Sequence, residues 1–522
     1  MRSYTNFILL LVLFSFSIHT AHAQKDPVVQ RIIEIGKTDN QTMHHLDILT
    51  NRIGGRLIGS DNYETAVAWA KSEFEKWGMD VVLHQTGVLP IGFNRGPWFG
   101  RLLGGDNSFS TLEFATPSYT VGTKGVQRGH VLIEPKTQRE FDRMKGKLKG
   151  AWVLISGRST GFPIDYSSRA EALRDSTIAY NAKVEIKNDD IRKYNWDNRG
   201  NVNEKDLLSM KDEPALFYSE MVEAGILGII QSSPVPITAL YDRKNIDSMS
   251  WDNLPKIPDI KLNEHQYAKI EQMAKERQYF QLEFDIRNHF RMGPIPYYTV
   301  LGVIKGTEFP DEYVVVGGHL DAYDVATGAA DNGAGVAPSM EAARLIMKAG
   351  GKPKRTILVS LWSGEEFGLL GSSAWLKDNA ANLDNISAMF NRDGGPTVPT
   401  SVSVPQAMFV DFEKICAPIN DIDPKFPFKV NVVPARNRPI VGSGTDAGAF
   451  LAAGVPEVHL NTEDICGYYF SYSEIWHTTR DTYDKCPADY MDHTSIVKAI
   501  VVYGVANLDH LLARDGYFKE KE

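Results

Sequence analysis

The 522-residue chain has 43% apolar and 23% charged side chains, a composition typical of globular proteins and not of disordered chains, collagen-like repeats or polytopic membrane proteins. Its 56 Lys and Arg against 65 Asp and Glu give a net charge of −9, which argues against nucleic acid as a partner. The length exceeds what one hydrophobic core usually supports, so two or three domains are expected.

The N-terminus has the pattern of a secretory signal peptide. Arg2 precedes the largely apolar run 7–18, and Ala21-His22-Ala23 has the small-x-small form that signal peptidase cleaves. The run is too short to span a bilayer core of about 30 Å. We therefore expect residues 1–23 to be removed and the protein to be secreted or periplasmic, with no membrane span.

Residues 27–86 are mostly helical in pattern. Apolar spacing predicts a first helix that includes Val28 and Ile35, and a second that runs from Ala66 to Trp77 and is stopped by Gly78. A strand follows at 81–83.

The pattern changes near Ser110 to short strands separated by polar, Gly-containing links, which predicts an inserted β-rich domain over 113–290 between parts 24–112 and 291–522 of another domain. Its strands are expected at 131–133, 151–155 and 226–230. The stretch 158–214 is charged and weakly periodic, and either a functional lid or a partly helical excursion would account for it. The excursion is favoured.

From Tyr297 onward, strands alternate with helices. Strands are predicted at 314–316, 356–361, 386–390, 429–433 and 455–460, with helices at 336–347, 372–378, 447–453 and 494–513. This alternation predicts an α/β fold, a three-layer α/β/α domain around a mixed, largely parallel sheet, with its chemistry beyond the carboxyl ends of the strands.

The first candidate ligands follow the strand at 314–316. His319 stands at its end, and Asp321 could accept the second imidazole N–H and fix the tautomer. Asp331 comes just before the next helix, where an N-cap is the ordinary use of Asp. Each residue alone favours a structural role.

Further acidic residues follow the next two strands. Glu365 and Glu366 are adjacent after 356–361, and two neighbouring carboxylates repel unless a cation lies nearby or one takes up a proton. A solvated acidic turn is the alternative for this pair. Asp393 follows 386–390, and His477 lies in a later loop.

Taken together, His319, Asp331, Glu366, Asp393 and His477 form a set of the size that two divalent ions bridged by one carboxylate require. One Glu of the adjacent pair would bind metal while the other faces the substrate as a base. Nitrogen and carboxylate donors without thiolate favour zinc, although manganese or cobalt could occupy such a site.

With these motifs the chain resembles the co-catalytic di-zinc exopeptidase family of bacterial leucyl aminopeptidases and glutamate carboxypeptidases, in particular its plasma glutamate carboxypeptidase (carboxypeptidase Q) branch. The similarity covers nearly all of the chain after residue 23. The residues that carry it are Gly55-Arg56-Leu57-Ile58-Gly59-Ser60, Gly318-His319-Leu320-Asp321, Asp324-Val325, Gly328-Ala329, Pro353-Lys354-Arg355-Thr356, Leu361-Trp362, Glu365-Glu366, Gly444-Thr445-Asp446, Ala453-Gly454-Val455-Pro456, and His477 with Asp481-Thr482.

The resemblance implies a role for each site residue. His319 and Asp393 would bind one Zn²⁺, Glu366 and His477 the second, and Asp331 would bridge them. It also implies that Glu365 is the general base, that Asp321 supports the ligands from behind, that 113–290 is a protease-associated domain and that the protein forms a homodimer.

The resemblance thus implies a secreted exopeptidase that acts on peptide substrates. A non-catalytic receptor-like protein and a single-zinc glutaminyl cyclotransferase on the same scaffold are the alternatives. Dipeptides or short peptides are the expected substrates, and the sequence does not decide between aminopeptidase, carboxypeptidase and dipeptidase activity, because the groups that bind the substrate's ends come from loops. Cys466 and Cys486 could form a disulfide, but unpaired thiols are favoured.

Overall fold

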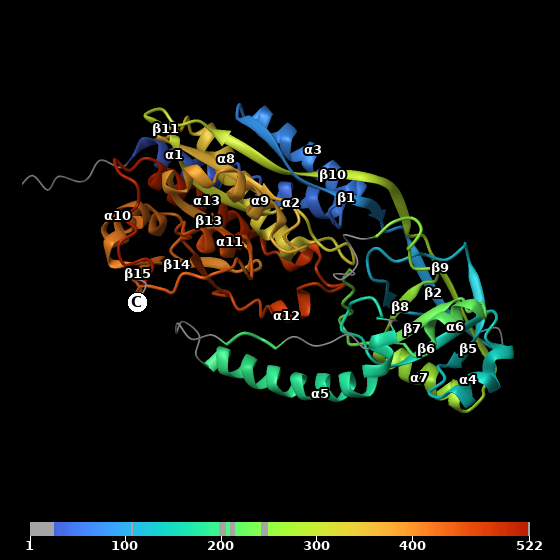
Figure 1. Cartoon of the computed structure of the whole chain (residues 1–522). Coiled ribbons are helices and arrows are strands. Elements are labelled where there is room, and N and C mark those ends of the chain that lie inside the picture. Colours follow the sequence, from blue (N-terminus) through green and yellow to red (C-terminus); the bar gives the residue numbers. More distant parts are fainter. Residues whose placement is uncertain are drawn as a thin grey trace, which may run out of the picture.

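The computed structural model describes residues 26–105, 108–165, 168–197, 205–208, 215–241 and 249–519. The expected signal peptide, 1–23, lies outside these residues. The chain forms a larger part around a five-stranded sheet and a smaller part around an eight-stranded sheet, and the two lie side by side (Figure 1). Within the described residues, no helix is both long and apolar enough to cross a membrane.

The sheet of the larger part is mixed. In spatial order its strands are β1 (Asp80–Asn94), β10 (His289–Ile304), β12 (Arg355–Trp362), β11 (Phe309–His319) and β13 (Ile386–Asn391). β11 runs parallel to both β12 and β13, whereas β10 is antiparallel to β1 and β12. The parallel pairing that the sequence predicts is therefore found in β11, β12 and β13, the strands that precede the candidate ligands.

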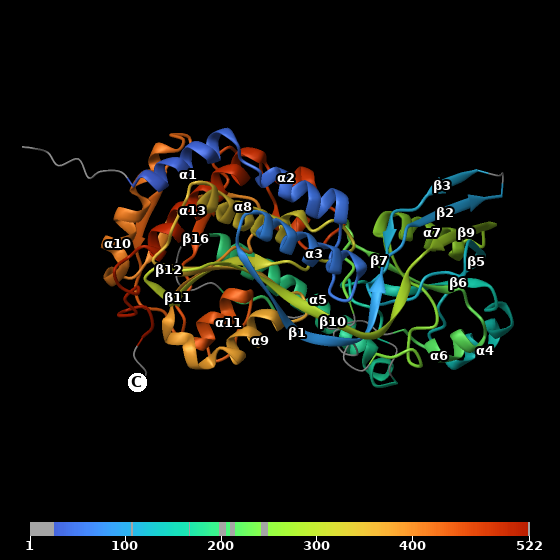
Figure 2. The same ribbon diagram turned by 90° about the horizontal axis from the view of Figure 1, so that it is seen from above.

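Helices cover both faces of this sheet, as Figure 2 shows, so the predicted α/β/α layering is confirmed. Alternation along β11 explains the layers: Val314 and Val316 pack into the core under α1, α3, α8 and α13, while Val315 packs on the other face with α9 and α11. The helices of this part are α1 (Pro27–Thr38), α2 (Thr42–Asp47), α3 (Asp61–Lys76), α8 (Ala334–Lys348), α9 (Leu370–Asp378), α10 (Gln406–Cys416), α11 (Asp446–Ala453), α12 (Tyr472–Ile475) and α13 (Ala488–Ala506).

A small sheet of β14 (Val398–Val404), β15 (Lys429–Val432) and β16 (Leu460–Glu463) completes the larger part. The strand predicted at 455–460 is wrong in position, since β16 begins at Leu460. The earlier residues make only a single bridge, between Glu457 and Met389 of β13. Pro456, which lacks an N–H, helps to limit pairing there. The helix predicted at 494–513 is also shifted, because α13 starts directly after Pro487 and ends at Ala506.

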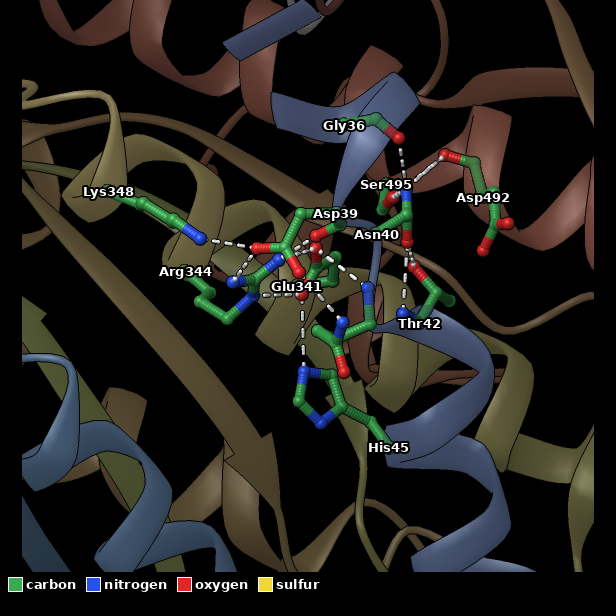
Figure 3. A network of polar contacts seen from close by, with 11 residues as sticks. Gly36, Asp39, Asn40, Thr42, His45, Glu341, Arg344, Lys348, Asp492 and Ser495 are labelled. Atoms are coloured by element: carbon green, nitrogen blue, oxygen red, sulfur yellow. Dashed lines mark hydrogen bonds and ion pairs between the residues drawn. The ribbon is translucent and has the colours of Figure 1, made fainter. Parts of the chain in front are cut away.

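Helix α8, which follows Asp331, is fixed to α2 and to the end of α1 by a partly buried polar network (Figure 3). Glu341 is fully buried; it accepts hydrogen bonds of 2.8 Å from both Nε and Nη2 of Arg344 and lies 3.2 Å from His45 Nε2. Arg344 and Lys348 also contact Asp39. The paired charges hold the start of the chain against α8.

The smaller part is inserted at one end of the β1–β10 ladder. The register of that ladder ends with Asn94 opposite His289; the chain leaves after Asn94 into β2 and returns from β9 just before His289. Its sheet has the order β3 (Phe109–Thr111), β2 (Trp98–Gly104), β9 (Phe280–Ile286), β5 (Gln127–Ile133), β6 (Ala151–Arg158), β7 (Gly228–Ser233), β8 (Asp259–Asn263) and β4 (Phe114–Ala115). Thus β2 and β3 of this sheet precede residue 113, where we expected the insertion to begin.

Helices α4 (Gln138–Met144), α6 (Tyr218–Glu223) and α7 (Glu264–Lys275) pack on the smaller part, whereas α5 (Ser168–Asp197) extends from it along the larger part (Figure 1). Two Asn side chains of α5 bind the returning chain: Asn188 pairs with the backbone of Leu208, and Asn195 with that of Lys205. The favoured prediction, that 158–214 is a partly helical excursion, is confirmed by α5.

All three cysteines are free thiols, and Cys416 and Cys486 are buried. The favoured prediction of unpaired cysteines is therefore confirmed, and Cys466 and Cys486 are not bridged.

Acid should destabilise the fold through His493. Its ring is 3% exposed, packs 4.8 Å from the Phe426 ring, and neither ring nitrogen has a hydrogen-bond partner among the described residues. Burial lowers the pKa of His493 to about 4. Lys37 also lowers this pKa, and the opposing effect of Asp423, which raises it, is smaller than that of burial. The unfolded state thus binds the proton more tightly, and stability present above pH 6.5 is lost as the pH falls towards 4, by up to about 3 kcal/mol.

Urea unfolding between pH 4 and 7 measures this effect. The variant His493→Phe should show a flatter pH dependence, and His510→Gln, which changes an exposed histidine, should follow the wild type. Parallel curves for the wild type and His493→Phe would contradict the prediction.

Candidate metal centre

The candidate ligands meet at one edge of the five-stranded sheet because three parallel strands end there. His319 is the last residue of β11, Glu365 and Glu366 follow β12, and Asp393 follows β13. Asp331 lies in the kinked turn Ala329–Gly333 ahead of α8, where its own backbone is not helical (φ −122°, ψ 94°), so it does not serve as the N-cap of that helix.

The two carboxylate oxygens of Asp331 face two different histidines. Oδ1 lies 3.2 Å from His319 Nε2, and Oδ2 lies 3.1 Å from His477 Nε2. His477, in the loop after α12, also lies 3.0 Å from Glu366 Oε2. Asp331 is thus positioned between two groups of donors.

The remaining acidic residues lie on the His319 side. Asp393 Oδ1 is 3.5 Å and Glu365 Oε2 is 4.0 Å from His319 Nε2. The structure therefore brings all the predicted site residues into one cluster. Potential ligand atoms of His319, Asp331 and Glu366 lie within 4.8 Å of one another, as do those of His319, Glu365 and Asp393.

Several donor atoms of this cluster are buried and lack a well-formed hydrogen bond among the described residues: His319 Nε2, Asp331 Oδ2 and Glu366 Oε1. Buried polar atoms without such bonds are unusual in a native fold. A cavity of about 10 Å³ lies beside Asp331, Glu366 and His477, which is close to the minimum that a single water needs. The donor set fits divalent cations.

Comparisons with known proteins agree with this fit. Residues 299–502 match the model of Peptidase family M28. These residues form a peptidase family M28 domain. The range contains every candidate ligand and both Glu365 and Asp321, so the protein is a peptidase whose predicted site lies inside the family domain.

Relatives extend the similarity beyond the M28 domain. "Carboxypeptidase Q" of Xenopus laevis is 25% identical over 93% of this chain and 91% of its own length. A Peptidase M28 precursor from Shewanella amazonensis has a similar structure, with a TM-score of 0.56 and 21% identity over 93% of this chain and 97% of its own. A zinc aminopeptidase from Bacillus subtilis has a TM-score of 0.50 at 15% identity, over 92% and 97% of the two chains. These structures share the fold.

Negative charge accumulates in the M28 site. Burial raises the pKa of Glu365 to about 11 and that of Glu366 to about 7. Burial alone would lower the pKa of both histidines, but the carboxylates around them outweigh it: the pKa of His319 lies well above its ordinary value, and that of His477 is raised to about 10. Bound cations would relieve both effects at once.

Asp321 supports the site differently from what the sequence suggested. The Nδ1 of His319 lies 2.9 Å from the backbone carbonyl oxygen of Asp321 and 3.7 Å from its carboxylate. The carboxylate instead accepts hydrogen bonds from the backbone N–H groups of Glu365 and Glu366, at 3.1 and 3.2 Å. Asp321 therefore fixes the turn that carries both glutamates.

Asp481 fixes the backbone next to Asp331, in the same way that Asp321 fixes the backbone of the two glutamates. Its carboxylate accepts hydrogen bonds from the backbone N–H groups of Ala330 at 2.6 Å and Asp331 at 3.1 Å. The Asp481-Thr482 pair was noted in the sequence without a role. Asp446, at the start of α11, is also buried near the cluster, and burial raises its pKa to about 7.

Arg56, in the Gly55 to Ser60 motif, connects the N-terminal segment to the site. Its fully buried guanidinium donates to backbone carbonyl groups of three segments: Leu49 and Gly54, Leu320, and Thr327 and Gly328. Burial lowers the pKa of Arg56 to about 10, against the opposing effect of Asp481 and Asp321, so it remains charged at neutral pH. Arg56 thus fixes the loops that follow His319 and precede Asp331.

Replacing Arg56 with Lys should destabilise the protein by roughly 2–4 kcal/mol, because three ammonium N–H groups cannot serve five buried carbonyl groups. Guanidinium unfolding measures the change. Arg52→Lys, at a neighbouring side chain that is 68% exposed, should shift the stability by less than about 0.5 kcal/mol. Equal effects of the two variants would contradict this prediction.

Proposed function

We propose that the protein is a di-zinc exopeptidase that hydrolyses dipeptides or short peptides. The observation that carries the proposal is the position of Asp331, whose two oxygens face His319 and His477. A carboxylate arranged in this way suits a bridging ligand of two ions. The M28 domain match supports the reaction class.

His319 and Asp393 would hold one ion, Glu366 and His477 the other, and Asp331 both. Imidazole and carboxylate donors without thiolate favour zinc. The Bacillus subtilis protein with the similar fold is named a zinc aminopeptidase, which agrees with this choice of metal.

Glu365 is the residue that we assign as general base. Its side chain is 10% exposed and lies on the His319 side of the cluster, 4.0 Å from His319 Nε2, and not in the Asp331–His477 group. When bound, the two cations would polarise the scissile carbonyl and make a water more acidic. Glu365 would take the proton of the attacking water and pass it to the leaving amine, with its backbone held in place by Asp321.

The similarity to proteins named carboxypeptidase Q, which spans most of both chains, supports a peptide substrate. A panel of free, N-blocked and C-blocked dipeptides, incubated with zinc-loaded protein and analysed by mass spectrometry, tests it. Cleavage only when both ends are free would define a dipeptidase. Cleavage of C-blocked but not N-blocked substrates would define an aminopeptidase, and the reverse pattern a carboxypeptidase.

Two results of the same assay would overturn the proposal. Absence of hydrolysis across the panel by fully metal-loaded protein would favour a receptor-like scaffold. Release of pyroglutamate from peptides with N-terminal Gln, together with one bound zinc, would favour a cyclotransferase. The metal content must therefore be measured on the same sample.

We further propose that the smaller part is a protease-associated domain, that residues 1–23 direct secretion and that the protein is a homodimer. The parallel strands β5 to β8 with their helices support the domain assignment. N-terminal sequencing of the exported protein should begin at Gln24. Light scattering should give twice the monomer mass.

A further inference from the structure

One segment of the smaller part, 237–241, is buried in the core of the larger part. Ile237 and Ala239 are fully buried, and Tyr241 is 3% exposed. All three belong to the hydrophobic core that contains Tyr323 and Val325, which follow the first candidate ligand. This segment follows β7, so it belongs by sequence to the insertion.

The segment is also held by the smaller part. Leu240 accepts a hydrogen bond of 2.6 Å from the backbone N–H of Ser118 and donates one of 2.8 Å to the backbone carbonyl of Gly161. Ser118 follows β4 and Gly161 follows β6. The position of segment 237–241 therefore depends on the folding of the insertion.

Tyr241 contacts the loop of Glu366. Its hydroxyl donates a hydrogen bond of 3.1 Å to the backbone carbonyl of Glu366. Its ring stacks on that of Phe367, with centroids 4.1 Å apart and planes inclined by 14°. The backbone of Glu366 is thus held from one side by Asp321 and from the other by Tyr241.

The same segment contacts the loop of His477. The backbone N–H of Thr479 donates a hydrogen bond of 2.9 Å to the carbonyl of Ile237, and Thr238 forms an antiparallel bridge with Thr478. The ring of Tyr323 connects the two contacts, with its centroid 6.2 Å from that of Tyr241 and 4.4 Å from that of His477.

We propose that segment 237–241, with Tyr241 as its principal positioning residue, aligns Glu366 and His477 for the second metal ion. The proposal rests on the di-metal function proposed above. Glu366 and His477 come from loops more than 100 residues apart in sequence, and the inserted segment touches both. The insertion is thereby part of one metal site and not only a neighbour of it.

Metal affinity, measured on apoprotein by zinc titration against a chelating dye, tests the proposal. Residues behind the ligands typically change metal affinity by about ten- to a hundredfold. We expect Tyr241→Ala to weaken one of the two zinc equivalents by about that factor and to leave the other unchanged. Tyr241→Phe, which loses only the hydroxyl, should weaken the same equivalent by a smaller factor.

Tyr267→Phe is the matched control. Tyr267 is likewise buried in the insertion, and its hydroxyl donates to a backbone carbonyl, that of Ile155 at 2.7 Å, within the smaller part. This variant should bind both zinc equivalents as the wild type does. The Co²⁺ spectrum should change in both Tyr241 variants and should match that of the wild type in Tyr267→Phe.

The possible outcomes distinguish the positioning role of Tyr241 from the di-metal function on which it rests. Two wild-type equivalents with unchanged affinities in both Tyr241 variants would overturn the positioning role alone. Equal weakening by Tyr267→Phe would also overturn it, since the effect would then come from loss of insertion stability. Fewer than two equivalents in the wild type would refute the di-metal function itself, and the positioning role with it.

Discussion

The variant Glu365→Gln is expected to bind two zinc ions as the wild type does and to turn over its best dipeptide about two to four orders of magnitude more slowly. The amide has the shape of the carboxylate but cannot accept the proton. Asp321 would still hold the backbone N–H of residue 365, so the turn should keep its geometry. The kcat and the zinc content of the same preparation measure the effect.

Glu366→Gln is the internal control, because the neighbouring side chain is assigned to metal binding. It should lose zinc, whereas Glu365→Gln should not. If Glu365→Gln lost zinc instead, Glu365 would be a ligand alongside His319 and Asp393, an arrangement that their ligand atoms, within 4.8 Å of one another, would permit. Wild-type turnover in Glu365→Gln would refute its role as base.

The second large effect is expected at Asp331. Replacing it with Ala removes the carboxylate whose two oxygens face His319 and His477, so the affinity for both zinc ions should fall, each by more than the hundredfold typical of changes behind the ligands. Zinc content after dialysis against a weak chelator, followed by elemental analysis, measures the loss.

Single-histidine variants provide the comparison. His319→Ala and His477→Ala should each lose chiefly one equivalent, and a different one. Loss of a single equivalent in Asp331→Ala would contradict bridging and assign Asp331 to one ion. Circular dichroism must show that each variant is folded, since Asp331 also lies in the turn that Asp481 holds.

Much of the site could be predicted because its ligands follow strands. His319, Glu366 and Asp393 come at the ends of apolar runs, and parallel neighbours bring such ends to one edge. The roles of the ligands remain predictions, but their proximity does not depend on the resemblance. The helices α1, α3, α8 and α11 were likewise predicted from apolar spacing and were confirmed with small shifts of their ends.

The supporting contacts could not be predicted in this way. Arg56 binds carbonyl groups more than 250 residues later, and Tyr241 reaches a loop more than 100 residues later, so no local pattern marks either partner. The carboxylate of Asp321 was matched to the wrong group because the neighbouring imidazole was the only partner visible nearby in the sequence. The prediction of a strand at 455–460 was wrong because it relied on the apolar composition of the segment and gave too little weight to Pro456, which cannot donate a backbone hydrogen bond.

The β1–β10 ladder has a consequence for how such a protein can be divided. Because Asn94 and His289 face each other at its end, a tight turn between them would close an ordinary β-hairpin and remove the whole insertion without rerouting the rest of the chain. Such a truncation would be topologically simple, yet it would also delete Tyr241 and expose the apolar surface that segment 237–241 covers. The insertion could therefore be removed without changing the path of the remaining chain, but the larger part would lose a piece of its hydrophobic core. A minimal peptidase built on this sheet would need a substitute for those five residues.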